Sequence, residues 1–267
     1  MPNQWDYYSM VGFQPETNPP EELERLTIND DETSLFLDFD GTLVDIAPTP
    51  DAIEVNDTLK ALLNDLHQRH GGAVAIVSGR NLQVIDHYLG GFAGTVSGGH
   101  GAELRHGSEQ QDGIECDFER LDHFKNAVRE FAAIDTRIMA EDKSFGIVLH
   151  FRQHPDLECK VRDFLKSLVG DDDQFEIQAA KMALEIKPKG ISKADAIKRI
   201  TEFPEFVDRN ILFAGDDTTD ETAFSWVNEK GGVTIKIGEG PTCAHYRTAS
   251  PSSFKAWLGS HAEARES

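Results

Sequence analysis

The stretch Leu35–Val44 constrains the fold and chemistry of this chain more than any other part. It reads Leu-Phe-Leu-Asp-Phe-Asp-Gly-Thr-Leu-Val, a short apolar run followed by two aspartates and a glycine turn. An apolar run of this length, bounded by glycine, is typical of a buried strand. Asp38 and Asp40 therefore follow the carboxyl end of a strand, where open α/β sheets bind their ligands.

The two carboxylates point to phosphoryl chemistry. They repel each other, so a buried pair needs a cation or a shared proton. Mg²⁺ fits because it is a hard ion that binds one or two carboxylates together with phosphate oxygens. One aspartate can then attack phosphorus while the other transfers the proton. The alternative is an acidic turn after a core strand, because Asp-Gly is a common turn dipeptide.

Composition limits the possible partners and the compartment. The chain has 267 residues, 39% of them hydrophobic, and a formal net charge of −21, which gives no general attraction for nucleic acid or anionic membranes. No stretch reaches the apolar length of a membrane span, and the N-terminus lacks a signal-peptide pattern. Cys116, Cys159 and Cys243 are far apart and odd in number, which favours reduced thiols. We therefore expect a cytoplasmic protein.

Hydrophobic periodicity predicts an α/β protein with a Rossmann-like parallel-sheet core. Helical patterns at 55–67 and 82–89 alternate with strand-like runs at 73–77 and 95–97, and the same alternation returns after Ser192. The expected domains are an N-terminal tail at 1–32, a discontinuous catalytic core at 33–106 and 186–267, and an inserted cap at 107–185.

The inserted segment has a different pattern. One helix (121–131) and two strands (137–140 and 145–151) are followed by another helix (157–169) and two more strands (175–179 and 182–186). This order predicts an α+β domain with an antiparallel sheet. It places Glu141 and Lys143 on the turn between the first two of these strands.

Ser78-Gly79-Arg80 follows the predicted strand at 73–77 and opens a helix. A hydroxyl and backbone N–H groups at such a place suit an anionic oxygen, and Arg80 could add charge-assisted hydrogen bonds. The alternative is a serine that only caps the helix.

Two later segments carry charged side chains at comparable places. Lys193 begins a predicted helix, where its charge opposes the helix dipole, a conflict expected of a functional residue. An exposed lysine is the alternative, and Lys187 and Lys189 are rival candidates. Gly215-Asp216-Asp217-Thr218-Thr219-Asp220 follows another predicted strand, where a turn that caps the next helix is the alternative reading.

Taken in chain order, the segments that contain Asp38, Ser78, Lys193 and Asp216 resemble the four signature motifs of the haloacid dehalogenase superfamily. The resemblance implies that Asp38 is the nucleophile, forming an aspartyl-phosphate, and that Asp40 is the general acid and base. It implies Mg²⁺ as cofactor, held by Asp38, the Asp40 carbonyl and Asp216. The residues expected to bind the phosphoryl group or to orient these ligands are Ser78, Gly79, Arg80, Lys193, Asp217 and Asp220.

Further segments resemble trehalose-6-phosphate phosphatases over about residues 34–258. They are His100-Gly101-Ala102-Glu103, Glu141-Asp142-Lys143-Ser144-Phe145, Glu185-Ile186-Lys187-Pro188, and Gly215–Glu221. The resemblance implies that Glu141, Lys143 and Glu185 bind sugar hydroxyls and that His100 contacts the substrate. It implies an enzyme, a phosphoric monoester hydrolase that releases trehalose and phosphate from trehalose 6-phosphate.

Two other functions stay open. One is a phosphatase of the same superfamily that acts on another small sugar phosphate, such as a sucrose phosphate or a glycosyl-glycerate phosphate. The other is a catalytically silent binding domain. The intact set of Asp38, Asp40, Lys193 and Asp216 argues against it, because clustered charges are costly without a use.

Overall fold

The computed structural model describes residues 21–47, 52–111, 116–143, 145–151, 154–180 and 182–263. These residues form two units, each considered separately below. The core unit comprises the described residues up to 111 and from 192 onward, and the cap unit comprises those between 116 and 191.

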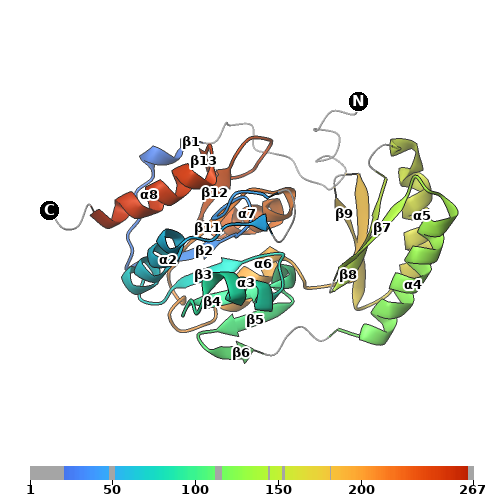
Figure 1. Cartoon of the computed structure of the whole chain (residues 1–267), viewed down its shortest axis with the longest axis horizontal. Helices are drawn as coiled ribbons and strands as arrows, with labels where there is room; N and C mark the ends of the chain where they lie inside the picture. Colours follow the sequence, from blue (N-terminus) through green and yellow to red (C-terminus); the bar gives the residue numbers. More distant parts are fainter. Residues whose placement is uncertain are drawn as a thin grey trace. The chain divides into compact units, whose positions relative to one another are not determined.

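The core unit is built on a nine-stranded sheet of order β1-β13-β12-β11-β2-β3-β4-β5-β6 (Figure 1). In this order, the first seven strands, from β1 at the edge through β13, β12, β11, β2 and β3 to β4, pair in parallel. Strands β5 and β6 then extend the sheet with antiparallel pairings. The strands are β1 (Glu21–Glu22), β2 (Thr33–Leu37), β3 (Val74–Val77), β4 (Thr95–Gly98), β5 (Glu103–His106), β6 (Glu109–Gln111), β11 (Asn210–Gly215), β12 (Val233–Ile237) and β13 (Tyr246–Thr248).

The central strand β2 explains why the apolar run before Asp38 predicts the fold. Leu35, Phe36 and Leu37 are each fully buried, as expected of a parallel strand covered on both faces. The strand lies between β3 and β11 in parallel register. The sheet confirms the predicted α/β class.

Three helices of the core unit begin at side-chain caps, which are provided by Asn56, Asn81 and Ser192. The helices of this unit are α2 (Asp57–Arg69), α3 (Leu82–Leu89), α6 (Lys193–Ile200), α7 (Glu221–Glu229) and α8 (Pro251–Glu263), with short 3₁₀ turns η1 (Leu23–Arg25), η3 (Gly99–Gly101) and η5 (Thr218–Asp220). Helix α2 starts two residues later than predicted because the Asn56 side chain accepts a hydrogen bond from the Leu59 amide. Helix α2 buries Leu59, Leu63 and Leu66.

The strand order reverses beside β2. The chain continues from β2 to β3 and β4 on one side, and β11, β12 and β13 lie on the other side. In open α/β sheets, ligands bind beyond the carboxyl ends of the strands at such a reversal. Asp38 follows β2, Ser78 follows β3 and Asp216 follows β11, so three predicted site residues leave neighbouring strand ends.

The cap unit is a four-stranded antiparallel sheet of order β7-β8-β10-β9 with two helices. Its elements are α4 (Phe118–Ile134), β7 (Met139–Lys143), β8 (Gly146–His150), η4 (Pro155–Leu157), α5 (Glu158–Val169), β9 (Phe175–Ala180) and β10 (Ala183–Pro188). Their order confirms the predicted α+β pattern.

Four expectations from the sequence are corrected. The predicted return to the core at residue 186 is too early, because β10 runs through Pro188 in the cap sheet and the cap unit ends at Ile191. The hairpin of β5 and β6 continues the core sheet, so the core unit extends past residue 107 to Gln111. Part of the expected tail belongs to the core, because β1 pairs with β13 and Leu23 is buried; residues 1–20 lie outside the described residues. Strand β7 includes Glu141 and Lys143, since its pairing with β8 runs on to Gly146.

No helix in the described part of the chain has both the length and the apolar character needed to cross a membrane.

Candidate active site

Asp38 lies buried at the end of β2, with 3% of its surface exposed. One carboxylate oxygen, Oδ1, accepts a hydrogen bond from Lys193 Nζ at 2.7 Å, and the other, Oδ2, accepts one from Thr42 Oγ1 at 3.2 Å. The backbone amide of Asp38 donates to the Ala214 carbonyl at 3.0 Å. Thr42 is a site residue that the sequence analysis gave no role, although it belongs to the Asp-x-Asp-Gly-Thr segment.

Lys193, the first residue of α6, joins two carboxylates. Its Nζ lies 2.7 Å from Asp38 Oδ1 and 2.6 Å from Asp220 Oδ1, and the residue is 4% exposed. Burial alone lowers the pKa of the ammonium, but Asp220 and Asp38 outweigh it and raise that pKa above its ordinary value. Among the three candidate lysines, the structure brings Lys193 to Asp38.

The two rival lysines have other contacts. Lys187 Nζ donates to the Ile191 carbonyl and lies 3.4 Å from Glu176 Oε1. Lys189 Nζ donates to the Asp172 carbonyl at 2.7 Å. Both therefore hold local backbone in place.

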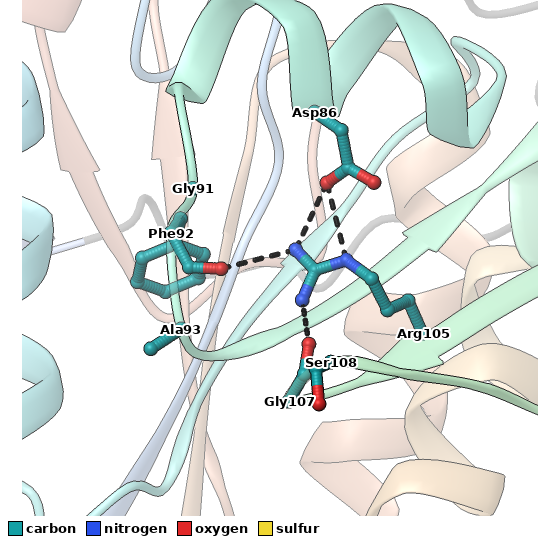
Figure 2. Close-up of a pocket in the computed structure, with 7 residues that line it drawn as sticks. All are labelled: Asp86, Gly91, Phe92, Ala93, Arg105, Gly107 and Ser108. Atoms are coloured by element: carbon teal, nitrogen blue, oxygen red, sulfur yellow. Dashed lines mark hydrogen bonds and ion pairs between the residues drawn. The ribbon is translucent and has the colours of Figure 1, made fainter.

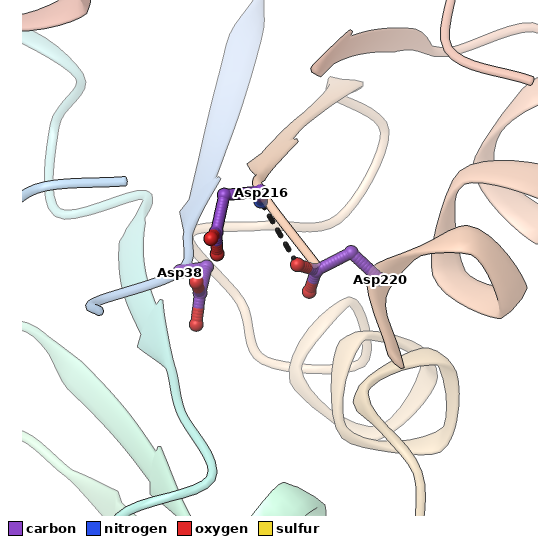
Figure 3. Close-up of side chains that lie close together, drawn as sticks. All are labelled: Asp38, Asp216 and Asp220. Carbon is purple, nitrogen blue, oxygen red and sulfur yellow. Dashed lines mark hydrogen bonds between the residues drawn. The ribbon is translucent and has the colours of Figure 1, made fainter. Parts of the chain in front are cut away.

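Three carboxylates converge beyond the ends of β2 and β11. Ligand atoms of Asp38, Asp216 and Asp220 all lie within 4.8 Å of one another (Figure 3). Burial raises the pKa of Asp38 well above its ordinary range, and burial together with Asp220 raises the pKa of Asp216 to about 6. In addition to burial, the nearby carboxylates make Asp38 and Asp216 harder to ionise, and a divalent cation would offset this repulsion. Mg²⁺ fits such a site because it is a hard ion that binds carboxylate oxygens.

Two glycines allow this convergence. Gly41 has φ +75°, and a Cβ there would lie 2.1 Å from Asp216 Oδ2. A Cβ on Gly215 would lie 2.4 Å from Asp220 Cγ. Both glycines are needed because a side chain at either place would occupy the space of a carboxylate.

Asp220 is the most constrained of the three carboxylates. Its Oδ2 accepts the amides of Asp216 at 3.0 Å and Asp217 at 2.9 Å, while Oδ1 accepts from Lys193. Asp217 is exposed, and its side chain accepts the Thr218 amide at 2.7 Å to cap η5. Within Gly215–Asp220, Asp217 thus has the helix-capping role that was the alternative for this segment. Asp220 instead orients the loop backbone at Asp216 and Asp217 and the side chain of Lys193.

Asp40 and Arg80 form a two-point ion pair. Arg80 Nε lies 2.6 Å from Asp40 Oδ2, and Arg80 Nη2 lies 2.7 Å from Asp40 Oδ1. The fork of a guanidinium fixes a carboxylate in one orientation. The carboxylate of Asp40 therefore lies outside the three-carboxylate cluster and is held by the residue expected to bind the phosphoryl group.

Ser78 and His100 lie in adjoining backbone turns. Ser78 is 1% exposed, and its Oγ accepts the Arg80 amide at 3.1 Å. It does not cap α3, because Asn81 fills that place and accepts the Val84 amide. The His100 amide donates to the Ser78 carbonyl at 2.9 Å, and a Cβ on Gly79 would lie 2.5 Å from the His100 ring. Gly79 thus lets the imidazole cover this turn.

Lys236 is a second residue that the sequence analysis missed. It is 5% exposed, lies opposite Gly215 in the β11–β12 pairing and donates to the Asp216 carbonyl. Its contact fixes the backbone from which the Asp216 carboxylate projects. A lysine within a strand gives no motif by which sequence reasoning could have found it.

The predicted sugar-binding residues all belong to the cap unit. Lys143 Nζ lies 3.2 Å from Glu185 Oε2, although β8 separates their strands. Gly146 of β8 makes this possible, because a Cβ there would lie 3.0 Å from Glu185 Oε1. Glu141 Oε2 lies 2.6 Å from His150 Nε2.

A cavity of about 600 Å³ in the core unit is lined by none of the predicted site residues (Figure 2). It is lined by Asp86, Gly91, Phe92, Ala93, Arg105, Gly107 and Ser108. Arg105 donates to Asp86 and to the carbonyls of Phe92 and Gly107. The Arg105 guanidinium is therefore already paired with the Asp86 carboxylate and with backbone carbonyls, and its charge is not available to bind an anionic ligand in the cavity.

Replacing Asp216 with Asn should stabilise the metal-free protein at neutral pH. The folded-state pKa of Asp216, about 6, exceeds its ordinary value of 3.8, so the ionised group opposes folding above pH 6. This cost fades as the pH falls through 6 toward 4, where the folded and unfolded forms are both protonated. We expect Asp216→Asn to gain up to about 2 kcal/mol at pH 7.5.

Urea unfolding in EDTA, at pH 7.5 and pH 4, measures this effect. The gain should be present at pH 7.5 and vanish at pH 4. Asp217→Asn removes an exposed charge that contributes only part of the repulsion, so its gain at pH 7.5 should be much smaller. A wild-type protein more stable than the variant at pH 7.5 would contradict the prediction.

Comparison with known proteins finds relatives over most of the chain. The trehalose-phosphatase family model matches residues 36–255. A probable trehalose-phosphate phosphatase of Sinorhizobium fredii is 36% identical over 219 residues, which are 81% of this chain and 82% of the relative. The trehalose-6-phosphate phosphatase of Escherichia coli is 34% identical over 84% of each chain.

Solved structures share the fold. A crystal structure of a trehalose-6-phosphate phosphatase related protein aligns with a TM-score of 0.62 and 26% identity, covering 84% of this chain and 95% of that one. The Aspergillus fumigatus trehalose-6-phosphate phosphatase aligns with a TM-score of 0.72 and 22% identity, covering 88% and 93%. A haloacid dehalogenase-like hydrolase from B. subtilis has the same fold at a TM-score of 0.61.

Proposed function

Because the chain belongs to the trehalose-phosphatase family, we propose that it hydrolyses trehalose 6-phosphate to trehalose and phosphate in a Mg²⁺-dependent reaction. The observation that carries the proposal is the position of Asp38. It is buried at the strand-order reversal, bonded to Lys193 and within 4.8 Å of Asp216. An acidic turn with no function would not need a buried lysine shared between two carboxylates.

Asp38, Asp216 and the Asp40 carbonyl would hold the metal ion. When bound, Mg²⁺ would neutralise the charge of the phosphate and that of the clustered carboxylates. Asp220 would take part indirectly, because its oxygens are already bonded to Lys193 and to two backbone amides. The Lys236 contact would keep the Asp216 backbone in place.

The reaction would proceed in two displacements at phosphorus. In the first, an oxygen of Asp38 attacks, the bond from phosphorus to the sugar oxygen breaks, and Asp40 gives that oxygen a proton. In the second, Asp40 takes a proton from water, which attacks the aspartyl-phosphate and regenerates Asp38. Thr42, through its bond to Oδ2, would keep the Asp38 carboxylate oriented throughout.

The remaining residues of the core unit would serve the phosphoryl group. Ser78, with the backbone at Gly79, and Lys193 would donate to its oxygens and stabilise charge in the transition state. Arg80 would hold Asp40 in the orientation needed for proton transfer, and His100 would close the turn around Ser78.

We also propose that Glu141, Lys143 and Glu185 recognise the sugar. Each can hydrogen-bond hydroxyl groups, and they stand on one face of the cap sheet (register Glu141 opposite Val148, and Val148 opposite Glu185). A cytoplasmic location is consistent with the proposal, because Cys116, Cys159 and Cys243 are all free thiols.

Phosphate release from a panel of sugar phosphates tests the proposed substrate. The panel contains trehalose 6-phosphate, a sucrose phosphate and a glycosyl-glycerate phosphate, each with Mg²⁺. We expect kcat/KM for trehalose 6-phosphate to exceed the others by at least about a hundredfold, because a site built to hydrogen-bond hydroxyls rejects poorer matches. A higher value for another member of the panel would reassign the substrate.

Removing the metal should abolish activity. The three carboxylates repel one another and the phosphate without a cation, so exhaustive EDTA treatment should leave no measurable turnover, and added Mg²⁺ should restore it. Circular dichroism before and after treatment controls for unfolding. Full activity in the chelated protein would rule out the metal-dependent mechanism.

Replacing Glu141 or Lys143 with Ala should impair recognition of the sugar. We expect each change to lower kcat/KM for trehalose 6-phosphate by at least about tenfold, or 1.4 kcal/mol, the scale of a lost hydrogen bond to a charged group. Hydrolysis of p-nitrophenyl phosphate should change far less, because this small substrate lacks the sugar. Equal losses on both substrates would show a structural role, and no loss on either would refute the assignment.

A further inference from the structure

One face of the cap sheet is polar. Residues opposite one another in an antiparallel sheet share a face, so Glu141, Val148 and Glu185 lie in one row. Lys143 and His150 are two residues away along β7 and β8 and therefore lie on the same face. The opposite face is apolar and packs with α4 and α5 through Ile147, Leu149, Leu184 and Ile186.

His150 has an unusual environment on the polar face. It is 8% exposed, at the end of β8, and its Nε2 lies 2.6 Å from Glu141 Oε2. Its other ring nitrogen, Nδ1, is buried and has no hydrogen-bond partner among the described residues. Among the described residues, the imidazole therefore has one hydrogen-bond partner, Glu141. Because a carboxylate can only accept, Nε2 must carry the proton in this bond.

The partner of this bond is an exposed side chain. The side chain of Glu141 is 52% exposed, and its second oxygen, Oε1, accepts no hydrogen bond from the described residues. An exposed glutamate normally samples several rotamers, so a ligand that binds it must bear the cost of ordering it. A buried ring cannot move as freely and can hold the carboxylate in one orientation in advance.

We propose that His150 is a positioning residue for substrate recognition, fixing Glu141 so that its second oxygen can accept a hydrogen bond from a sugar hydroxyl. The inference rests on the proposed function, in which Glu141 binds the sugar. His150 itself does not touch the substrate. The residue lies outside every segment that led to the prediction of Glu141, Lys143 and Glu185.

Replacing His150 tests the proposal through KM. His150→Phe keeps an aromatic ring but removes the donor, and we expect KM for trehalose 6-phosphate to rise about threefold to tenfold with kcat nearly unchanged. His150→Gln, whose amide can reach the position of Nε2, should recover most of the loss. His123→Phe is the matched control, because His123 is an exposed histidine on α4 of the same unit.

A double-mutant cycle separates positioning from direct binding. In a Glu141→Ala background, adding His150→Phe should change KM no further, because the group that His150 holds is gone. A further rise in KM there, or an equal loss of p-nitrophenyl phosphate hydrolysis, would overturn the proposal. Thermal unfolding checks each variant, and His150→Asn, too short to reach Glu141, replaces His150→Phe if the latter does not fold.

The same set of variants distinguishes the two levels of inference. If Glu141→Ala raises KM and His150→Phe does not, the positioning role fails and the sugar-binding role of Glu141 stands. If Glu141→Ala leaves KM unchanged, the sugar-binding role fails and the positioning role fails with it.

Discussion

Asp38→Asn should abolish turnover of trehalose 6-phosphate and leave the fold intact. Asn keeps the size of the side chain and can still accept the Thr42 hydrogen bond, but it has no anionic oxygen to attack phosphorus. It also removes one of the charged metal ligands. We expect kcat to fall by at least about a thousandfold, or roughly 4 kcal/mol in the activation barrier.

Phosphate release, with circular dichroism and thermal unfolding as controls, measures this effect. Asp217→Asn is the matched substitution, because Asp217 follows the neighbouring strand β11 but is exposed and caps a turn. It should retain most of the activity. Substantial turnover by a folded Asp38→Asn protein would refute the role of Asp38 as nucleophile.

Lys193→Met should have the second-largest effect. The ammonium is shared between Asp38 and Asp220 within 2.7 Å, so its loss leaves buried carboxylates without their counter-charge. We expect kcat/KM to fall by about a hundredfold or more, since one charged donor to the phosphoryl group is lost. The metal-free protein should lose about 3 kcal/mol of unfolding free energy at neutral pH.

Steady-state kinetics and urea unfolding in EDTA measure the two losses. Lys198→Met, on the same helix α6, is the control, because Lys198 pairs with Asp195 at the surface and should change neither quantity much. The stability loss should shrink as the pH falls, because the carboxylates left behind can then take up protons. Activity of Lys193→Met within a few-fold of wild type would contradict the account.

The order of elements could be predicted from the sequence because each carries a local signal. The continuous apolar run before Asp38 marks a strand covered on both faces, and the i, i+3, i+4 pattern of Leu59, Leu62 and Leu63 marks a helix. The convergence of Asp38 and Asp216 followed from a topological rule, since both residues leave the ends of parallel strands.

The remaining features depend on tertiary contacts that leave no periodic signal. Strands β5, β6 and β13 have at most four residues and contain no continuous apolar run, so no hydrophobic pattern marks them. Glu141 and Lys143 are polar residues on an edge strand, so their segment looks like a turn until its pairing with β8 is seen. Lys236 of β12 contacts Asp216, which follows β11, and His150 of β8 contacts Glu141 of β7. Each contact joins two different strands and therefore depends on how the strands pair.

The central claim is that Asp38 carries the phosphoryl group between two displacements. Asp40→Asn tests it with p-nitrophenyl phosphate, because p-nitrophenolate can leave without an acid and the variant then lacks only the base that activates water for the second displacement. Mixed with p-nitrophenyl phosphate and Mg²⁺ and quenched in acid, it should release up to one equivalent of p-nitrophenol per enzyme, with little free phosphate. Mass spectrometry of the digested protein should then place the phosphoryl group on Asp38. A phosphoryl group on any other residue, or equal release of p-nitrophenol and phosphate in the first turnover, would contradict the account.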